Sequence, residues 1–343
     1  MSWYYDECSI PSARHRQLAR QRQTELTKPP GSLGRLEGIA VDFAGWQANA
    51  LPALSRIAVR VFAADHGISR RGVSAYPPEV TAQMIANFIT GGAAINVLCQ
   101  AQGADFSVIN MGTLNPIPDA PGLHNLQLAA GSEDFSIGPA LSQSLLDQCL
   151  EAGKAQVDAL DCQLFVAGEM GIGNTTAAAA LYAAQLGLCG YDVAGRGTGI
   201  DDSTLQVKRI LIDQALELHA SQLDSPLAML RCLGGLEIAA ICGAYLRCGQ
   251  RGIPVLVDGF IATAAALLAM DINPGLKNWL MAAHRSSESA HGLALDAMNL
   301  RPLLDLDLRL GEGSGALVAI PLIRSALQLH SQMATFGEAA ISA

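Results

Sequence analysis

The stretch QLFVAGEMGIGNTTAAAALYAA, residues 163–184, contains the pattern that decides the fold. It begins with an apolar run that is typical of a buried strand in a parallel sheet. The run ends at a loop that contains Gly168, Gly171 and Gly173, and alanines with high helix propensity follow. The stretch therefore predicts a strand, a glycine-rich loop and a helix, with Glu169 at the end of the strand.

The alternation of strand, loop and helix continues along most of the chain. Further strand-like runs occupy residues 56–64, 105–111, 253–260 and 278–284, and a weaker run occupies residues 303–310. Helical patterns lie between them, at residues 81–89, 142–160, 236–248 and 262–270. This alternation predicts an α/β fold with a mostly parallel sheet that is covered by helices on both faces.

The two chain ends carry helical patterns without strands. Residues 12–26 and 35–47 have helical spacing and are separated by the helix-breaking sequence KPPG, and the tail is helical from Gly315 to about Phe336. These helices either form a small helical domain built from both chain ends or add to the faces of the sheet. The pattern alone favours neither arrangement.

Composition and charge exclude several classes of protein. The 343 residues are 50% hydrophobic and 15% charged, and the formal net charge of −9 argues against a nucleic-acid partner. No run of about 18 uninterrupted apolar residues is present, so we expect no membrane span. Residues 1–17 lack the basic-then-apolar order of a signal peptide. The eight cysteines, none in a CxxC pair, are typical of buried thiols in a reducing compartment, and we predict a cytoplasmic protein.

Polar or glycine-rich motifs follow nearly every predicted strand. The carboxyl ends of parallel strands meet at one edge of a sheet, where loops and helix N-termini converge and ligands bind. The sequence therefore predicts a ligand site at that edge, formed by DHG at 65–67, Gly112 and Thr113, GIGNTT at 171–176, Asp258, RSSES at 285–289 and GEGSG at 311–315.

The segment GEMGIGNTT, residues 168–176, has the features of an anion-binding loop. Its glycines let backbone N–H groups approach an oxyanion, the following helix offers its positive end, and Thr175 and Thr176 add hydroxyl groups. No lysine follows as in a P-loop, which disfavours nucleoside triphosphate hydrolysis. The segment loosely resembles a dinucleotide fingerprint, but Asp192, about 20 residues on, lies in a glycine-rich segment and not after a strand. A tight turn without a ligand is the other alternative.

A second glycine-rich segment, GRGTGIDDSTLQVKR, occupies residues 195–209. Asp202 or Ser203 is expected to cap the helix that follows, and Lys208 is expected about two turns into that helix. The chain has only four lysines, so a lysine near a predicted phosphate site is a candidate ligand. A solvated helix lysine is the commoner case.

Two more motifs carry candidate functional groups. In HRSSESAH, residues 284–291, the spacing of His284 and His291 fits one face of a helix, but no third ligand has a recognisable spacing and we expect no metal. Ser286 and Ser287 are expected to cap a helix or to donate hydroxyl hydrogen bonds. In GEGSG, Glu312 is either an acid stabilised at a helix N-terminus or a general base at the ligand edge. With Glu169 it would give two carboxylates for cation stabilisation and proton removal.

Nine motifs occur along the chain in a fixed order: KPPGSLGRLE, AADHGI, GVSAYPPEVTAQM, GGAAINVL, GEMGIGNTTAAAA, GRGTGIDD, PVLVDGF, AHRSSESAH and LRLGEGSGA. Together they resemble the nicotinate-nucleotide:dimethylbenzimidazole phosphoribosyltransferase family of the cobalamin pathway, from about Lys28 to the C-terminal helix. The resemblance implies transfer of phosphoribose from nicotinate mononucleotide to 5,6-dimethylbenzimidazole, without metal or cofactor. It also implies a homodimer with a doubly wound large domain, residues 51–295, and a small helical domain built from both chain ends. Residues 1–50 give the N-terminal part of the small domain, and residues 296–343 hold the last strand, the loop with Glu312 and the C-terminal part of the small domain.

The resemblance also assigns roles to single residues. Glu312 corresponds to the proposed base of the family, and Glu169 lies near the ribose. The residues assigned to the nucleotide and its 5′-phosphate are Gly171, Gly173, Asn174, Thr175, Thr176, Gly197, Lys208, Asp258 and Ser286. Gln83 lines the base pocket, and Met170 and Leu310 are expected to sandwich the benzimidazole. Transfer to a different lower-ligand base stays open, because Ala75 and Tyr76 lie in a segment that varies in the family. An NAD-type oxidoreductase is the weaker alternative.

Overall fold

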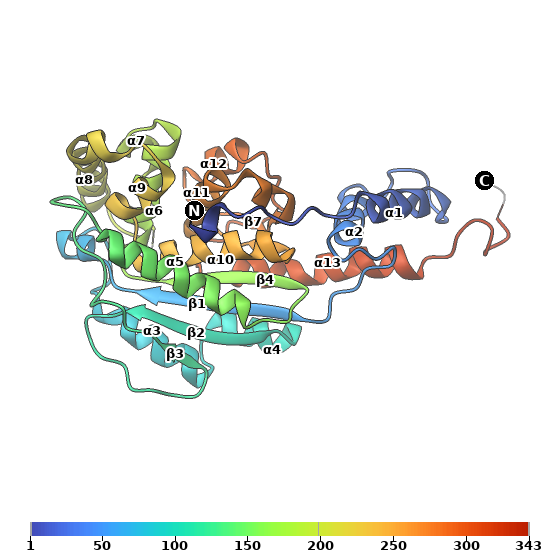
Figure 1. The fold of residues 1–343 in the computed structure, drawn as a ribbon, viewed down its shortest axis with the longest axis horizontal. Helices are drawn as coiled ribbons and strands as arrows, with labels where there is room; N and C mark the ends of the chain where they lie inside the picture. The colour runs from blue at the N-terminus through green and yellow to red at the C-terminus, as the bar shows by residue number, and fades with distance from the viewer. Residues whose placement is uncertain (1, 198, 342–343) are drawn as a thin grey trace.

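The computed structural model describes residues 2–197 and 199–341, so Thr198 of the second glycine-rich segment lies outside the described residues (Figure 1). The strands are β1 Ile57–Ala64, β2 Asp105–Gly112, β3 Leu123–Asn125, β4 Leu164–Met170, β5 Val255–Val257, β6 Leu280–Ala282, β7 His284–Arg285 and β8 Leu304–Asp305. The helices are α1 Ala13–Glu25, α2 Arg35–Trp46, α3 Glu79–Thr90, α4 Ala94–Gln102, α5 Gln143–Asp158, α6 Asn174–Leu186, α7 Gly190–Val193, α8 Asp202–His219, α9 Pro226–Leu233, α10 Leu236–Arg251, α11 Phe260–Ile272, α12 His291–Ala297 and α13 Ser314–Gln332.

Six strands form one parallel sheet in the order β3-β2-β1-β4-β5-β6. This order is that of a doubly wound sheet, in which the chain proceeds outward from β1 in one direction and returns to add β4 on its other side. The predicted fold class is therefore confirmed. The direction of winding changes between β1 and β4, and in such sheets that change marks the ligand crevice.

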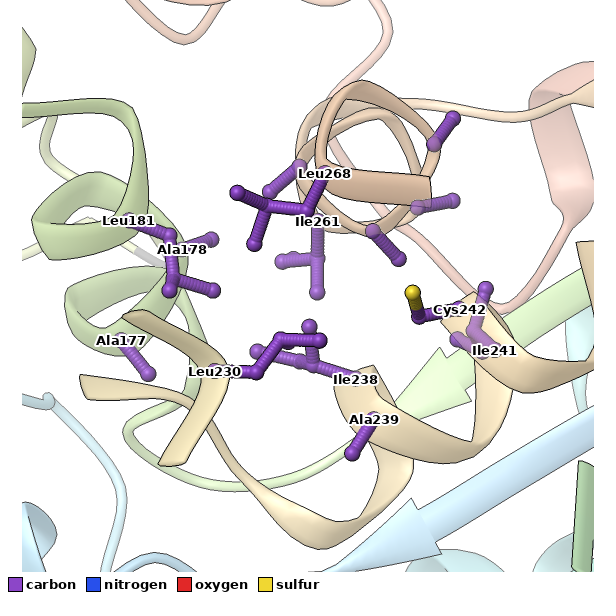
Figure 2. Packing of buried hydrophobic residues seen from close by; sticks show 14 of the residues in the cluster. Ala177, Ala178, Leu181, Leu230, Ile238, Ala239, Ile241, Cys242, Ile261 and Leu268 are labelled. Atoms are coloured by element: carbon purple, nitrogen blue, oxygen red, sulfur yellow. The ribbon is translucent and has the colours of Figure 1, made fainter. Parts of the chain in front are cut away.

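Strand β1 is buried on both faces, and its side chains alternate between two hydrophobic cores. Ala58 and Phe62 belong to a core shared with α5, α6, α9, α10 and α11, whereas Val59 and Val61 belong to a core shared with α2, α3, α4 and α13. Figure 1 shows α5 and α10 on one side of the sheet and α3 and α4 on the other. Figure 2 shows side chains from α6, α9, α10 and α11 converging in the first core. Helices thus cover both faces of the sheet, as the alternating pattern predicted.

The helices of the two chain ends pack against each other. Helix α1 packs on α2, and α2 packs on α13. The Arg22 guanidinium donates to the backbone carbonyls of His330, Ser331 and Met333, which joins α1 to the end of α13. The same helices extend beyond the end of the sheet in Figure 1, although buried residues of α2 and α13 also contribute to the core under β1. The division at residues 50 and 295 stays a prediction.

Several local predictions were wrong. Gly168 lies inside β4 rather than in the following loop. Residues 303–310 contain only the two-residue strand β8, which pairs with β7 outside the main sheet, because the amides of Leu303 and Leu304 bond to the carbonyl of Ala283. Within residues 278–284, Trp279 ends a 3₁₀ helix before β6 begins. Helix α4 was missed because Gly91, at φ 82°, interrupts an apolar segment that continues beyond it.

The segment Glu79–Gln102 is unusually apolar. Residues Glu79–Gln102 are long and apolar enough to cross a membrane by length and composition alone, with mean hydropathy 1.3. In the structure the segment is divided at Gly91 into α3 and α4, which pack against β1 and β2. It is therefore part of the helical layer on the sheet and not one continuous span.

All eight cysteines are free thiols. Five of them are buried, as predicted, namely Cys99, Cys149, Cys232, Cys242 and Cys248. The prediction of burial was wrong for the exposed Cys189 and for the half-buried Cys8 and Cys162. Burial raises the pKa of the Cys8 thiol to about 11, so this thiol stays protonated at neutral pH.

Helices α5 and α10 approach each other closely, and this contact predicts the effect of a substitution. A Cβ atom at Gly153 of α5 would collide with the Ala240 carbonyl of α10, whereas Gly38 of α2 has open space at the same position. We expect Gly153→Ala to lower the free energy of unfolding by about 1–3 kcal/mol through overpacking. Gly38→Ala, the matched control, should be neutral or stabilising because alanine has the higher helix propensity. Denaturant unfolding of both variants tests this, and equal effects would contradict it.

Candidate active site

The candidate site lies where β1 and β4 end side by side. Asp65 and His66 follow β1, and Glu169 lies at the end of β4, one residue before its last. Parallel pairing aligns Phe62 of β1 with Glu169 of β4, so the two strands reach the same edge. This edge is the point at which the direction of winding changes, and the structure places the predicted polar motifs there.

Glu169 is buried at the end of β4. The residue is 6% exposed, and the side-chain amide of Asn174, the first residue of α6, donates to its Oε2 atom. Burial raises the pKa of Glu169 to about 8, and the nearby carboxylates of Glu237 and Asp258 add to the effect. A cation placed beside this buried carboxyl group would lower its pKa and favour its ionised form, so the position favours the binding of a positive charge.

Glu312 lies on a loop with unusual backbone geometry. Gly311, Glu312 and Gly313 all have left-handed φ angles, of 87°, 65° and 84°. A positive φ is uncommon for glutamate, and such geometry persists only where the surroundings enforce it. A Cβ atom at Gly168 of β4 would collide with the Glu312 carbonyl, and a Cβ atom at Gly311 would collide with Glu169 Oε1. The two glycines therefore allow the Glu312 loop to lie directly against the end of β4.

Asp258, at the end of β5, holds this loop in place. Its Oδ2 atom accepts from the Gly313 amide at 3.2 Å, and its Oδ1 atom accepts from the Ala316 amide at 2.8 Å. Both amides belong to the first turn of α13 and its cap, so Asp258 satisfies backbone donors that the helix leaves free. These contacts engage both oxygens of Asp258, so its position supports the loop of Glu312. Sequence reasoning had assigned it to the nucleotide.

Burial also governs the charge of the other two carboxyl groups. Burial raises the pKa of Glu312, although the Ile95 amide donates to its Oε2 atom at 3.4 Å and opposes the shift. Burial likewise raises the pKa of Asp258, against the opposing influence of His284. Three buried acids therefore converge on one edge of the sheet, and a cationic group placed among them would be favoured electrostatically.

The glycine-rich loop leads directly into α6. Gly173 caps the helix with φ 99°, and the Ile172 amide donates to Thr81 Oγ1 at 3.2 Å. Thr176 is fully buried, and its hydroxyl has no partner among the described residues. The Asn174 side chain donates to Glu169, and its assignment to the nucleotide stays a prediction.

Lys208 lies about two turns into α8, as predicted, but it is buried rather than solvated. It is 1% exposed, and its Nζ atom donates to Thr175 Oγ1 at 3.0 Å and to the Gly195 carbonyl at 3.3 Å. Burial lowers its pKa to about 8, and the charge of Glu288 opposes this shift. A Cβ atom at Gly197 would lie 3.2 Å from Thr175 Oγ1, so the two glycine-rich segments meet at this lysine.

A cavity of about 400 Å³ opens beside the second glycine-rich segment. Its lining includes Gly195, Gly197, Ser287, Glu288 and Arg309. The Arg309 guanidinium donates to the Gly197 carbonyl at 2.9 Å. Glu288 and Arg309, which both line this cavity, were not singled out from the sequence. Glu288 lies within the HRSSESAH motif, and Arg309 lies two residues before GEGSG, so their positions in the sequence could have identified them.

The HRSSESAH motif does not form one helix. His284 lies in β7, whereas His291 begins α12, so the predicted common helix face is wrong. The Ser286 amide donates to His291 Nδ1 at 2.7 Å, and the His291 Nε2 atom lies 3.0 Å from Thr263 Oγ1. Burial lowers the pKa of His291 to about 3, so the ring is neutral and structural. Neither Ser286 nor Ser287 caps α12, because Ala290 occupies the cap position.

The predicted cap of α8 and the alternative of a dinucleotide site at Asp192 can both be compared with the structure. Asp201, not Asp202 or Ser203, caps α8 by accepting from the Thr204 amide at 2.8 Å. Asp192 lies in α7 and accepts from the Cys189 amide at 3.1 Å, so it does not follow a strand as a dinucleotide site requires. Within residues 2–197 and 199–341, no group of three His, Cys, Asp or Glu side chains is arranged to hold a metal ion.

The three residues assigned to the base pocket come from three elements. Met170 is half-buried at the end of β4, next to Glu169, and Leu310 is 60% exposed directly before Gly311. Gln83 is exposed on α3, two residues after Thr81, which contacts the glycine-rich loop. Thr81 accepts from the Ile172 amide of the glycine-rich loop, and Gly311 lies against Glu169. These two contacts bring the segments of Gln83 and Leu310 to the edge where Met170 lies.

Comparisons with known proteins agree with this arrangement. A family model described as "Phosphoribosyltransferase" matches residues 8–341. The chain is similar to nicotinate-nucleotide–dimethylbenzimidazole phosphoribosyltransferase from Xanthomonas euvesicatoria pv. vesicatoria (strain 85-10), with 52% identity over 99% of this chain and 98% of the relative. The protein of the same name from Ectopseudomonas mendocina (strain ymp) is 50% identical over 100% of this chain and 98% of the relative.

A solved structure shows the same fold. The crystal structure of nicotinate-nucleotide-dimethylbenzimidazole phosphoribosyltransferase from Thermus thermophilus superposes with a TM-score of 0.91 and 45% identity, and covers 97% of this chain and 99% of that chain. The topology, the motifs at the carboxyl edge and these full-length similarities lead to one conclusion. The chain belongs to the family of nicotinate-nucleotide–dimethylbenzimidazole phosphoribosyltransferases.

Proposed function

We propose that this chain transfers the phosphoribosyl group of nicotinate mononucleotide to 5,6-dimethylbenzimidazole, with inversion, to give α-ribazole 5′-phosphate and nicotinate. The observation that carries the proposal is the approach of the Glu312 loop to the end of β4, which brings Glu312 and Glu169 to one edge of the sheet. Membership of the family supports the same reaction. The reaction needs one carboxylate near the ribose and one near the attacking base, and the end of β4 and the Glu312 loop supply them.

The phosphate of the nucleotide is proposed to bind where the two glycine-rich segments meet. Lys208 Nζ lies 3.0 Å from Thr175 Oγ1, and the segment at Gly197 lines the adjacent cavity. Backbone amides of Gly171 and Gly173, the start of α6 and the hydroxyl of Thr176 are the further donors proposed for the nucleotide, with Ser286 at the neighbouring loop. Helix N-termini and a buried lysine bind a phosphate without any metal ion.

The acceptor base is proposed to bind between Gln83, Met170 and Leu310. The exposed Leu310 side chain next to the Glu312 loop supplies an apolar surface for an aromatic ring. In this position one nitrogen of the benzimidazole faces the anomeric carbon of the ribose, and the other nitrogen faces Glu312. Asp258 is proposed to act by holding the Glu312 loop through its contacts with Gly313 and Ala316.

The chemistry follows from these positions. A lone pair on one benzimidazole nitrogen forms a bond to the anomeric carbon as the bond to the nicotinate nitrogen breaks on the opposite face. The electron pair of the broken bond neutralises the nicotinate ring, so no general acid is needed there. The other N–H of benzimidazole becomes strongly acidic, and Glu312 accepts its proton. Glu169 stabilises the positive charge on the sugar, which in turn favours the ionised form of this buried acid.

A chromatographic assay for nicotinate tests the proposed function. We expect nicotinate and α-ribazole 5′-phosphate to appear in equal amounts when nicotinate mononucleotide and dimethylbenzimidazole are both present. Binding of the nucleotide without its consumption would indicate a nucleotide sensor instead. Omission of dimethylbenzimidazole is the control, because simple hydrolysis would release nicotinate without it.

Removal of Lys208 should weaken the binding of nicotinate mononucleotide. A charge-assisted hydrogen bond contributes roughly 1.5–3 kcal/mol, so Lys208→Ala should lower nucleotide affinity at least about tenfold and leave benzimidazole binding intact. Wild-type affinity should also fall as the pH rises through about 8, because the lysine then loses its proton. Calorimetry measures both effects. Lys154→Ala, a substitution of the surface lysine paired with Glu151, is the matched control. Unchanged affinity in Lys208→Ala would show that the phosphate binds elsewhere.

Replacement of Glu312 tests its role as general base. Positioned general bases contribute about 10²–10⁴ in rate, so Glu312→Gln should lower turnover by about that factor while both substrates still bind. The base acts in its ionised form, and burial raises its pKa, so wild-type turnover should rise with pH above the range in which an ordinary glutamate titrates. This rise should be absent from the variant.

The outcomes for Glu312→Gln separate three roles. Near-normal turnover would contradict the assignment and move the role to Glu169. Loss of dimethylbenzimidazole binding alone would make Glu312 a recognition residue. Glu151→Gln, an exposed change on α5, controls for the loss of one negative charge.

The assembly and location of the protein are also part of the proposal. Family resemblance supports a homodimer and a small helical domain made from both chain ends, and the cysteine usage of the sequence supports a cytoplasmic location. Light scattering at micromolar concentration should give twice the chain mass of 35.9 kDa, because family interfaces of this kind are large and obligate. A monomer at that concentration would contradict the proposed dimer.

A further inference from the structure

A buried pair of titratable residues next to the site has no step in the proposed reaction. His66 follows β1, and Glu237 lies in the first turn of α10. The His66 Nε2 atom and the Glu237 Oε1 atom are 2.6 Å apart, and both side chains are 0% exposed. A fully buried pair of this kind is costly to desolvate, and well-packed apolar residues in its place often give equal or greater stability. The pair therefore calls for a role beyond general stability.

The His66 side chain packs against three glycines, two of which contact its imidazole ring. A Cβ atom at Gly171 would lie 3.2 Å from His66 Cδ2 and 3.3 Å from Nε2, and one at Gly173 would lie 3.3 Å from His66 Cβ. A Cβ atom at Gly235 would collide with His66 Cε1. Gly171 and Gly173 belong to the loop that directly follows Glu169. The ring therefore contacts this loop at Gly171, where a Cβ atom would also collide with the Ala64 carbonyl oxygen of β1.

The charge of the pair also acts on the site. Glu237 Oε2 and His66 Nδ1 are buried without a hydrogen-bond partner among the described residues. Glu237 is the strongest of the charges that raise the pKa of Glu169, ahead of Asp258 and Glu312. Asp65, beside His66, and Cys149 of α5 are further titratable neighbours of the pair. Burial raises the pKa of Tyr245 of α10, and the charges of Asp258 and Glu169 add to the effect. The buried Tyr245 hydroxyl has no hydrogen-bond partner in the described part of the chain.

We propose that the His66–Glu237 pair is a positioning device for Glu169, in which Glu237 holds the imidazole and the imidazole seats the loop that follows Glu169. The inference rests on the proposed function, because it takes Glu169 as the carboxylate beside the ribose. Neither His66 nor Glu237 touches the reacting atoms. They act by fixing where the Glu169 carboxylate lies and which charge it faces.

The substitution Gly235→Ala tests the positioning role without removing either member of the pair. Gly235 has an extended backbone, with φ −158°, that alanine adopts without strain. The conflicts of its added methyl group are with the His66 ring and with Glu237 Oε2, at 2.9 Å. Displacement of a catalytic group by about 1 Å costs on the order of 10²-fold in rate, so Gly235→Ala should lower kcat by up to about that factor with a smaller change in KM.

A double-mutant comparison identifies His66 as the mediator. In the His66→Ala background the methyl group of Gly235→Ala no longer meets a ring, so the second substitution should cause little further loss of kcat. An equal loss in both backgrounds, or no loss in Gly235→Ala alone, would overturn the proposal. His330→Ala is the matched control, because this buried histidine bonds to the Ala50 carbonyl near the end of α13 and should leave kcat unchanged.

A pH profile tests the charge of the pair and does not depend on the Gly235 variant being folded. Glu237→Gln keeps a hydrogen bond to His66 but removes the negative charge, so the limb of the turnover profile due to Glu169 should move to lower pH. Glu169→Gln identifies that limb by abolishing it. An unmoved limb in Glu237→Gln would contradict the proposal. Nicotinate release by the wild type is measured first, so failure of the proposed function is distinguished from failure of this inference.

Discussion

The site depends on one backbone contact, the approach of the Glu312 carbonyl to the α-carbon of Gly168. Any side chain at Gly168 would separate the last long loop of the chain from the centre of the sheet. Asp258 secures the same contact from β5 by accepting two amides at the start of α13. Three segments that are far apart in sequence therefore have to assemble before the two glutamates share one edge.

The structure places acids where water cannot solvate them. Glu169, Asp258 and Glu312 each have a raised pKa because of burial. Such a group of like charges destabilises the free protein, and a cationic substrate relieves that cost. Lys208 has the complementary property, since a buried lysine with a pKa of about 8 gains stability when a phosphate is present. In the proposed function, the cationic ring and the phosphate of one nucleotide would each offset one of these two unfavourable charge distributions, although the protein has a net charge of −9.

The sequence predicted the parallel sheet, its covering helices and the polar edge, because these depend on local periodicity and on the rule that carboxyl ends of parallel strands converge. Contacts between residues far apart in the sequence were predicted less well. Gly171 and Gly173 were interpreted as sites of anion approach, whereas the structure also packs them on His66. Residues 303–310 alternate like a strand, but the pairing of β8 with β7 depends on distant carbonyls. Glu237 gave no local signal, because its partner lies 171 residues away.

Helix α13 gives the protein an order of assembly. Its first turn carries the Glu312 loop, and its far end is held by Arg22 of α1. These contacts join residues 308 positions apart, and closure of so long a loop costs conformational entropy and slows folding. During synthesis the N-terminal helices and all six strands of the sheet emerge before α13 does. A nascent chain can therefore form its six strands while it still lacks α13, so the Glu312 loop is fixed against β4 only after α13 has emerged.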